Sequence, residues 1–108
     1  MRFTTAAEAV KLIRSNDSVY IQGSTSIPEA LVAAMADRGP ELRGVKVYSA
    51  FAVGAFEAPY CRPEYRDSFL VNSLFVANNI RRWLADGYGQ SIPAFLGEIP
   101  GLFRDGTL

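Results

Sequence analysis

The stretch YIQGSTSIPEAL at residues 20–31 decides the fold class of this chain. An apolar run of aromatic and β-branched residues ends at Gly23, and three hydroxyl residues then lead into a helical pattern. Ser26 and Glu29 have the spacing of a capping box, in which a hydroxyl and a carboxylate satisfy free backbone N–H groups at a helix start. We therefore expect a strand over residues 19–23 and a helix that begins at Ser26.

Strand and helix patterns alternate on both sides of this stretch. Upstream, Thr5 and Glu8 form another capping box at the start of an amphipathic helix. The further expected elements are strands over residues 45–51, 69–76 and 91–96, and a helix over residues 78–87 that Asn78 or Asn79 caps.

The helix from Ser26 has both an apolar stripe and a stop signal. Gly39 precedes Pro40, so the glycine is expected in a left-handed conformation after which proline prevents the helix from continuing. The residues expected on the buried face are Leu31, Ala34 and Met35.

Strands that alternate with helices predict an α/β fold with a mostly parallel sheet flanked by helices. The chain of 108 residues is long enough for one hydrophobic core, so we expect a single domain over residues 1–108. The pattern ends on a Gly-Thr-Leu connector where another strand is expected, which suggests an incomplete domain.

Composition excludes several classes of function. The cations are dispersed without a basic stripe, so no nucleic acid partner is expected. The longest apolar runs are far shorter than a membrane span, and the N-terminus is not a signal peptide, so we expect a cytoplasmic protein without a membrane partner. With no histidine and the single Cys61, the chain cannot form an internal disulfide, a Cys/His zinc site or a Ser-His-Asp triad.

The turn Gly23-Ser24-Thr25-Ser26 is the first candidate site. A glycine between a strand and a helix N-terminus lets a ligand approach free N–H groups, and the helix dipole favours an anion or a developing oxyanion. The turn has neither a Walker loop nor a Gly-x-Gly-x-x-Gly motif. A plain turn in which Ser26 only caps its helix therefore stays open as an alternative.

Carboxylates are the remaining acid, base or nucleophile candidates in a chain without histidine. Those expected in loops are Glu57, Glu64 and Glu98. Glu98 follows the last expected strand, and the carboxyl ends of parallel strands border the crevice in which open α/β sheets bind ligands. Glu98 could equally cap the turn that begins at Pro100.

Three colinear blocks of sequence carry a family resemblance: TAAEAVKLIRSNDSVYIQGSTSIPEALVAAM at 5–35, ELRGVKVYSAF at 41–51 and FLVNSLFVANNIRRWLADGYGQSIPAFLGEIPGLFRDG at 69–106. Together they resemble the N-terminal region of the acetyl-CoA hydrolase/transferase family, which includes 4-hydroxybutyrate CoA-transferases. The most specific part runs from Asn72 to Phe103. The first turn departs from the family, which often has Gly-x-Gly where this chain has Gly23-Ser24-Thr25.

The resemblance implies a fold of the CoA-transferase type, with two related α/β domains and an active site between them. In such enzymes a glutamate attacks an acyl-CoA thioester, and CoA then passes through a glutamyl thioester to an acceptor carboxylate or is released by water. That glutamate lies in the C-terminal half of the family, so it is expected outside this chain, and the chain alone is expected to be inactive.

The resemblance also implies which residues line the substrate cleft. Acyl-CoA and a small carboxylate are the expected partners, with coenzyme A entering as a thioester substrate and no permanently bound cofactor or metal. The expected substrate-binding residues are Gly23, Ser24, Thr25, Ser26, Ser49, Gly54, Asn78 and Glu98.

Two other functions remain open at this stage. One is a small, non-catalytic α/β binding or assembly domain derived from the same fold. The other is a phosphosugar isomerase, which the sequence disfavours because it offers no phosphate loop. A partial sheet with an uncovered apolar face would associate with itself or with the missing C-terminal domain, so we expect a homo-oligomer.

Overall fold

The computed structural model describes residues 2–23, 26–50, 58–76 and 78–108. Four strands form one sheet in the order β1-β2-β3-β4, and all three neighbouring pairs are parallel. The strands are β1 (Ser18–Ile21), β2 (Val45–Ser49), β3 (Phe69–Ser73) and β4 (Gly89–Ser91). The α-helices are α1 (Ala6–Ala9), α2 (Glu29–Asp37), α3 (Asn78–Ala85) and α4 (Ile99–Arg104), with 3₁₀ turns η1 (Val10–Leu12), η3 (Pro63–Tyr65) and η4 (Leu96–Glu98). The predicted α/β class with a parallel sheet is confirmed.

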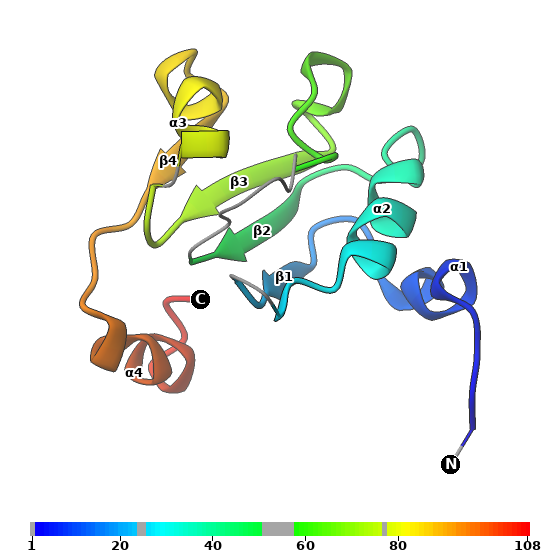
Figure 1. Cartoon of the computed structure of the whole chain (residues 1–108), viewed down its shortest axis with the longest axis horizontal. Helices are drawn as coiled ribbons and strands as arrows, with labels where there is room; N and C mark the ends of the chain where they lie inside the picture. Colours follow the sequence, from blue (N-terminus) through cyan, green and yellow to red (C-terminus); the bar gives the residue numbers. More distant parts are fainter. Residues whose placement is uncertain (1, 24–25, 51–57, 77) are drawn as a thin grey trace.

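The main core lies between one face of the sheet and the helices α1, α2 and α3 (Figure 1). Side chains alternate across a strand, so Val45 and Val47 of β2 are fully buried against this core while Lys46 between them is exposed. The helices contribute Val10, Val32, Met35, Ala36, Ile80 and Trp83 to the same cluster. These contacts hold α2 and α3 on one side of the sheet.

The opposite face of the sheet carries α4 (Figure 1). The rings of Tyr20 on β1 and Phe103 on α4 meet edge to face, with centroids 5.2 Å apart. On the same face, Gln90 Nε2 donates to Asn72 Oδ1 at 2.6 Å, which joins β4 to β3 through side chains. A chain that leaves β4 therefore crosses beneath the sheet back toward β1.

The two predicted capping boxes have different outcomes. Thr5 Oγ1 accepts a hydrogen bond from Glu8 N at 3.2 Å, as expected, although the Glu8 carboxylate pairs with Lys11. The box predicted at Ser26 is wrong, because α2 begins at Glu29 after an N-cap Pro28 that provides no side-chain hydrogen bond. Proline disfavours helical dihedral angles in the residue before it, so the helix cannot start ahead of Pro28.

The buried face and the end of α2 also differ from the prediction. Met35 is buried as expected, but Leu31 is 42% exposed, and Val32 and Ala36 are buried instead. Gly39 is not among the glycines of positive φ. A Cβ atom at Gly39 would lie 2.5 Å from the Tyr65 ring, so the glycine serves close packing and not a left-handed turn.

The last strand and the third helix start elsewhere than predicted. The strand predicted over residues 91–96 is wrong, because β4 covers Gly89–Ser91 and the chain then turns into η4. Pro93 has no N–H for a strand ladder, which explains why pairing stops before it. Helix α3 begins at Asn78, so Asn78 and Asn79 lie inside the helix and do not precede it as caps.

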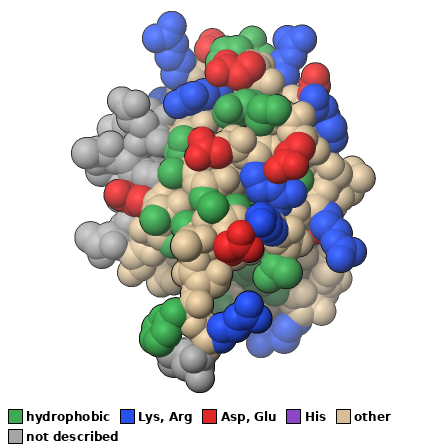
Figure 2. Space-filling view, turned by 90° about the vertical axis from the view of Figure 1, so that its right-hand side faces the viewer, with side chains coloured by type: hydrophobic (Ala, Val, Ile, Leu, Met, Phe, Trp, Pro, Cys, Tyr) green, Lys and Arg blue, Asp and Glu red, His purple; other side chains and the backbone are tan. Residues whose placement is uncertain are grey.

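Charges of both signs are interspersed on the face that carries α1 and α2, and apolar side chains lie exposed between them (Figure 2). This face therefore lacks the one-sign field that would attract a polyanion. None of the helices in the described ranges is long and apolar enough to cross a membrane.

Candidate functional site

The carboxyl ends of the four strands line up at one edge of the sheet. Ile21 of β1 is the register partner of Ser49, Ser49 pairs with Ser73, and Ser73 pairs with Ser91. Three serines thus end three adjacent strands side by side. In open α/β sheets, ligands bind outside the carboxyl ends of the strands, so this edge is the first place to look for a site.

A cleft of about 440 Å³ opens at this edge, between the ends of β3 and β4 and the segment that enters η4. Its polar side chains are those of Ser91 and Glu98, and the rest of the wall is apolar. The apolar lining consists of Leu74, Phe75, Val76, Pro93, Ala94 and Phe95. An apolar cavity with a few polar groups is the usual form of a small-molecule site.

Glu98 lies at the end of η4 with its side chain turned back toward the start of that turn. Its Oε2 accepts a hydrogen bond from Phe95 N at 3.0 Å. Glu98 also occupies the N-cap position of α4, but it makes no side-chain cap bond there. Glu98 thus stabilises the turn that precedes it and also lines the cleft, and the alternative in which its side chain caps the turn at Pro100 is not observed.

Ser49 lies beneath the surface of this edge. It is 2% exposed, and its Oγ has no hydrogen-bond partner, as is also true of the buried Tyr60 hydroxyl. Burial raises the pKa of Tyr60 far above its ordinary value, and Cys61 adds to this rise, whereas the Ser49 hydroxyl lowers it, so the two hydroxyls are neighbours although they do not meet in hydrogen-bond geometry. By contrast, Ser73 Oγ is satisfied, because it donates to Phe75 O at 2.6 Å.

The first turn is described only at its two ends. Ser26 N donates to Gly23 O at 3.3 Å, and Ser26 is exposed. Because α2 starts at Glu29, its free N–H groups lie beyond the hydroxyl residues, and the Glu29 carboxylate already occupies its first turn. The N-terminus of α2 therefore lies three residues after Ser26, and the role of this turn in binding stays a prediction.

The other expected site residues are distributed as follows. Asn78 is the first residue of α3, which follows β3 at the same edge of the sheet. Ser24, Thr25 and Gly54 lie outside the described residues.

Neither a metal site nor a reactive thiol is evident in the part of the chain that the structure describes. No group of three or more His, Cys, Asp or Glu residues is placed to hold a metal ion there. Burial raises the pKa of Cys61 to about 12, which keeps the thiol protonated and poorly nucleophilic at neutral pH.

Fold and site together define an α/β domain with a largely apolar cleft at the carboxyl edge of a parallel sheet. Comparison with protein families matches the whole chain, residues 1–108, to the acetyl-CoA hydrolase/transferase N-terminal domain. The chain therefore belongs to the acetyl-CoA hydrolase/transferase family.

Similar proteins include several CoA-transferases. Butyryl-CoA:acetate CoA-transferase of Anaerostipes caccae is 29% identical over 96% of this chain and 23% of the relative. The 4-hydroxybutyrate coenzyme A transferase of Clostridium kluyveri is 27% identical over 99% of this chain and 24% of the relative. Among solved structures, RipA from Yersinia pestis superposes with a TM-score of 0.78 at 27% identity, covering 92% of this chain and 25% of RipA. The chain spans about a quarter of the length of these relatives.

The cleft includes residues that the sequence did not single out. Ser91 was assigned to the start of a strand, and Phe75 and Phe95 belong to runs that read as strand interior. Both phenylalanines lie within the block from Asn72 to Phe103 that carries the family resemblance, but neither was named as a site residue. Of the expected site residues, the structure places Glu98 in the cleft.

Proposed function

We propose that residues 1–108 form the N-terminal part of a CoA-transferase-like domain, in a protein that moves CoA from an acyl-CoA to a small carboxylate or to water. The observation that carries this proposal is the cleft at the carboxyl edge of the sheet, in a chain that matches the family's N-terminal domain throughout. The activity belongs to the longer protein, because the chain spans about a quarter of its relatives.

The cleft suits one part of an acyl-CoA substrate. Its volume of about 440 Å³ lies in the range of roughly 300–1,000 Å³ that is usual for small-molecule sites. The walls formed by Leu74, Val76 and Phe95 would receive an acyl group or the apolar stretch of the CoA arm. Ser91 can donate or accept a hydrogen bond to orient a polar group of the substrate.

Glu98 would act in binding and not in covalent chemistry. Its carboxylate would repel a substrate carboxylate at contact distance, because the two charges have the same sign. Glu98 is instead suited to accept a hydrogen bond from an N–H or O–H group of the acyl-CoA. It also shapes the cleft wall through its bond to Phe95 N.

The covalent steps would use a glutamate from outside residues 1–108. Its carboxylate oxygen would attack the thioester carbonyl carbon and the C–S bond would break. This step releases the CoA thiolate and forms an acyl-glutamyl anhydride. The thiolate then attacks the glutamyl carbonyl and releases the first carboxylate. The acceptor carboxylate would then attack the glutamyl-CoA thioester, and the same two steps in reverse would give its CoA thioester and restore the glutamate. Attack by water on the glutamyl-CoA thioester would instead release free CoA, which amounts to hydrolysis.

The remaining residues proposed for the substrate side of the cleft follow the other strand ends. Ser49 would support this edge from beneath, since its hydroxyl is buried. The others are Gly23, Ser24, Thr25, Ser26, Gly54 and Asn78. We keep the expectations of a cytoplasmic protein and of coenzyme A as substrate, with no resident cofactor.

A matched pair of variants tests the role of Glu98. In the protein encoded by the complete gene, Glu98→Gln should change the KM for acyl-CoA at least several-fold with a smaller effect on kcat, because it alters binding and spares the nucleophile. Glu64→Gln is the control, since Glu64 is also an exposed glutamate in a 3₁₀ turn but does not line the cleft. Equal kinetics for both variants and the parent protein would remove Glu98 and the cleft from the proposal.

A further inference from the structure

The charged and hydrogen-bonding groups of the cleft at the carboxyl edge of the sheet restrict the kind of acyl group that it can receive. Among the residues that the structure describes, Ser91 and Glu98 provide the only polar side chains in its lining. All eleven Lys and Arg residues of the chain lie within the described ranges, and none of them lines the cleft. The one charge in the described lining is therefore negative.

The backbone of the cleft wall offers few donors that could compensate a second negative charge. Phe95 N already donates to Glu98 Oε2 at 3.0 Å, and Leu74 N donates to Ser49 O at 2.8 Å. Pro93 has no N–H group. A carboxylate inside a protein is usually held by a cation or by several donors, and the described lining offers it the single hydroxyl of Ser91. An anionic group placed here would lose water without gaining equivalent partners.

Two hydrogen bonds hold Glu98 beside Phe95 in the wall of the cleft. Glu98 N donates to Phe95 O at 2.9 Å, and Glu98 Oε2 accepts from Phe95 N at 3.0 Å. Both residues line the cleft. The negative charge is therefore anchored at a defined place, next to the apolar walls that would receive an acyl group.

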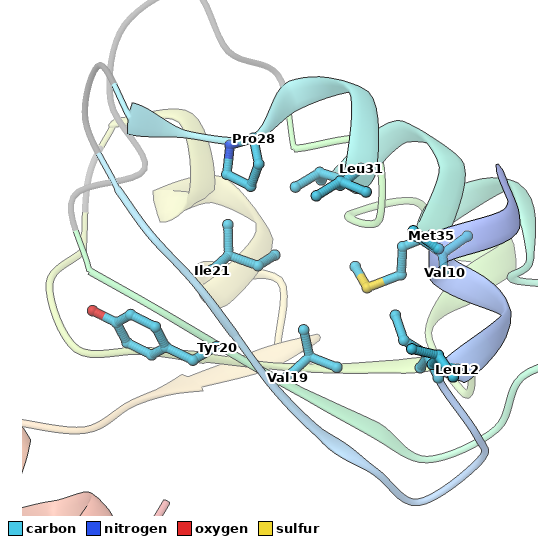
Figure 3. A pocket seen from close by; sticks show the side chains of 11 residues that line it. Val10, Leu12, Val19, Tyr20, Ile21, Pro28, Leu31 and Met35 are labelled. Carbon is cyan, nitrogen blue, oxygen red and sulfur yellow. The ribbon is translucent and has the colours of Figure 1, made fainter. Parts of the chain in front are cut away.

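A second cavity, a groove of about 350 Å³ between β1 and α2, is less suited to an acyl-CoA (Figure 3). Val19 and Ile21 approach this groove from β1, and Leu31 and Met35 approach it from α2. It shares no described lining residue with the cleft, and its described lining contains no charged or amide side chain that could orient a thioester. The acyl group is therefore assigned to the cleft and not to this groove.

We infer that the cleft selects acyl groups that carry no charge at their far end, those of monocarboxylic acids, over the acyl groups of dicarboxylic acids. This inference rests on the proposed function and names the class of acyl group that the same site takes. A terminal methyl group gains from burial against Leu74, Val76 and Phe95. A terminal carboxylate at the same place loses hydration and meets the like charge of Glu98.

The same preference applies to the acceptor. In the proposed sequence of steps the acceptor acid takes the place of the first carboxylate, so its far end lies against the same walls. Butyrate should therefore be a better acceptor than succinate.

Three acyl-CoA substrates with chains of the same length test the inference on the product of the complete gene. Butyryl-CoA ends in a methyl group, succinyl-CoA ends in a carboxylate, and the terminal amide of succinyl-CoA has the shape of the carboxylate without its charge. We expect kcat/KM for butyryl-CoA to exceed that for succinyl-CoA at least about 10-fold, with the amide between them.

Two pairs of variants test the role of charge. Glu98→Gln keeps an acceptor for Phe95 N but removes the negative charge, so the ratio of kcat/KM for succinyl-CoA to that for butyryl-CoA should rise at least about threefold. Glu64→Gln should leave this ratio unchanged, since Glu64 does not line the cleft. Phe95→Lys adds a cation at a cleft side chain that is 80% exposed, and it should raise the ratio above that of the uncharged control Phe95→Met.

The outcomes separate this inference from the proposed function. Use of succinyl-CoA as well as butyryl-CoA, an amide used as poorly as succinyl-CoA, or a ratio that neither change of charge moves would overturn the inference and leave the proposed function in place. Absence of CoA transfer and of hydrolysis with all three substrates would overturn the proposed function, and this inference with it.

Discussion

Replacing Gly89 with alanine should weaken the sheet at the strand that carries the cleft. Gly89 is the register partner of Val71. A Cβ atom at Gly89 would lie 2.8 Å from Val71 O, 2.7 Å from Leu84 Cδ2 and 3.1 Å from Val71 Cβ. The half-exposed Leu84 side chain can rotate away, but Val71 O belongs to the backbone of β3 and can move only if the two strands separate.

The expected cost follows from these distances. Overpacking of this kind costs about 1–3 kcal/mol, and the loss of glycine's freedom in the unfolded chain returns about 0.4–1 kcal/mol. We therefore expect Gly89→Ala to lower the free energy of unfolding by roughly 1–2 kcal/mol. Ser91 and the cleft should be displaced with β4, because β3 and β4 share only three register pairs.

Urea unfolding of the 108-residue chain measures this effect, with the single tryptophan, Trp83, as the fluorescent probe. Trp83 stacks on Tyr88 at a centroid distance of 4.5 Å, directly beside Gly89, so its emission reports on this part of the sheet. Gly97→Ala is the control, since a Cβ atom there meets nothing within 4 Å, and it should leave stability unchanged or slightly higher. Equal stability of the two variants would refute the packing argument.

Three further predictions concern the interior and the N-terminal segment. Tyr60→Phe removes a buried hydroxyl that makes no hydrogen bond of normal geometry and should leave stability unchanged or higher. Ser68→Ala removes a buried hydroxyl that donates to Gly39 O at 2.6 Å and should cost about 1–3 kcal/mol in urea unfolding. Because burial raises the pKa of Cys61 to about 12, iodoacetamide should alkylate this thiol far more slowly at pH 8 than it alkylates an exposed thiol. The free energy of unfolding should also fall as pH rises from about 8.5 toward 12, because only the unfolded thiol is ionised in that range. Fast alkylation of the native chain would contradict this prediction. Arg38→Ala removes the hydrogen bonds that Arg38 donates to the carbonyls of Val10 and Ile13, and it should lower the melting temperature by several degrees. Lys11→Ala breaks only an exposed ion pair and should change the melting temperature little. Similar shifts for the two variants would show that Arg38 does not hold the N-terminal segment on α2.

The sequence predicted those strands whose signals are local. β2 and β3 carry β-branched and aromatic residues, and both begin where the pattern placed them, although they end at Ser49 and Ser73, before the predicted residues 51 and 76. β4 could not be predicted in this way, because Gly89-Gln90-Ser91 has no strand propensity of its own. Its pairing depends on the close approach of Gly89 to β3 and on the Gln90–Asn72 hydrogen bond, which are both tertiary contacts.

The candidate site was predictable to the same limited degree. Glu98 could be selected because carboxylates near the ends of parallel strands face a ligand crevice. Ser91 could not, since its place in the cleft depends on where β4 ends and on its register with Ser73. The groove beside β1 was equally hidden, because a local pattern does not specify which strand lies at the edge of a sheet.

The most direct test of the proposed function is to find the covalent intermediate. The complete gene product would be incubated with acyl-CoA, denatured, digested and searched by mass spectrometry for a glutamate that carries CoA as a thioester. We predict CoA transfer to a carboxylate or water, with the modified glutamate outside residues 1–108. A modified glutamate within residues 1–108 would contradict the account, as would a protein with neither CoA transfer nor hydrolysis.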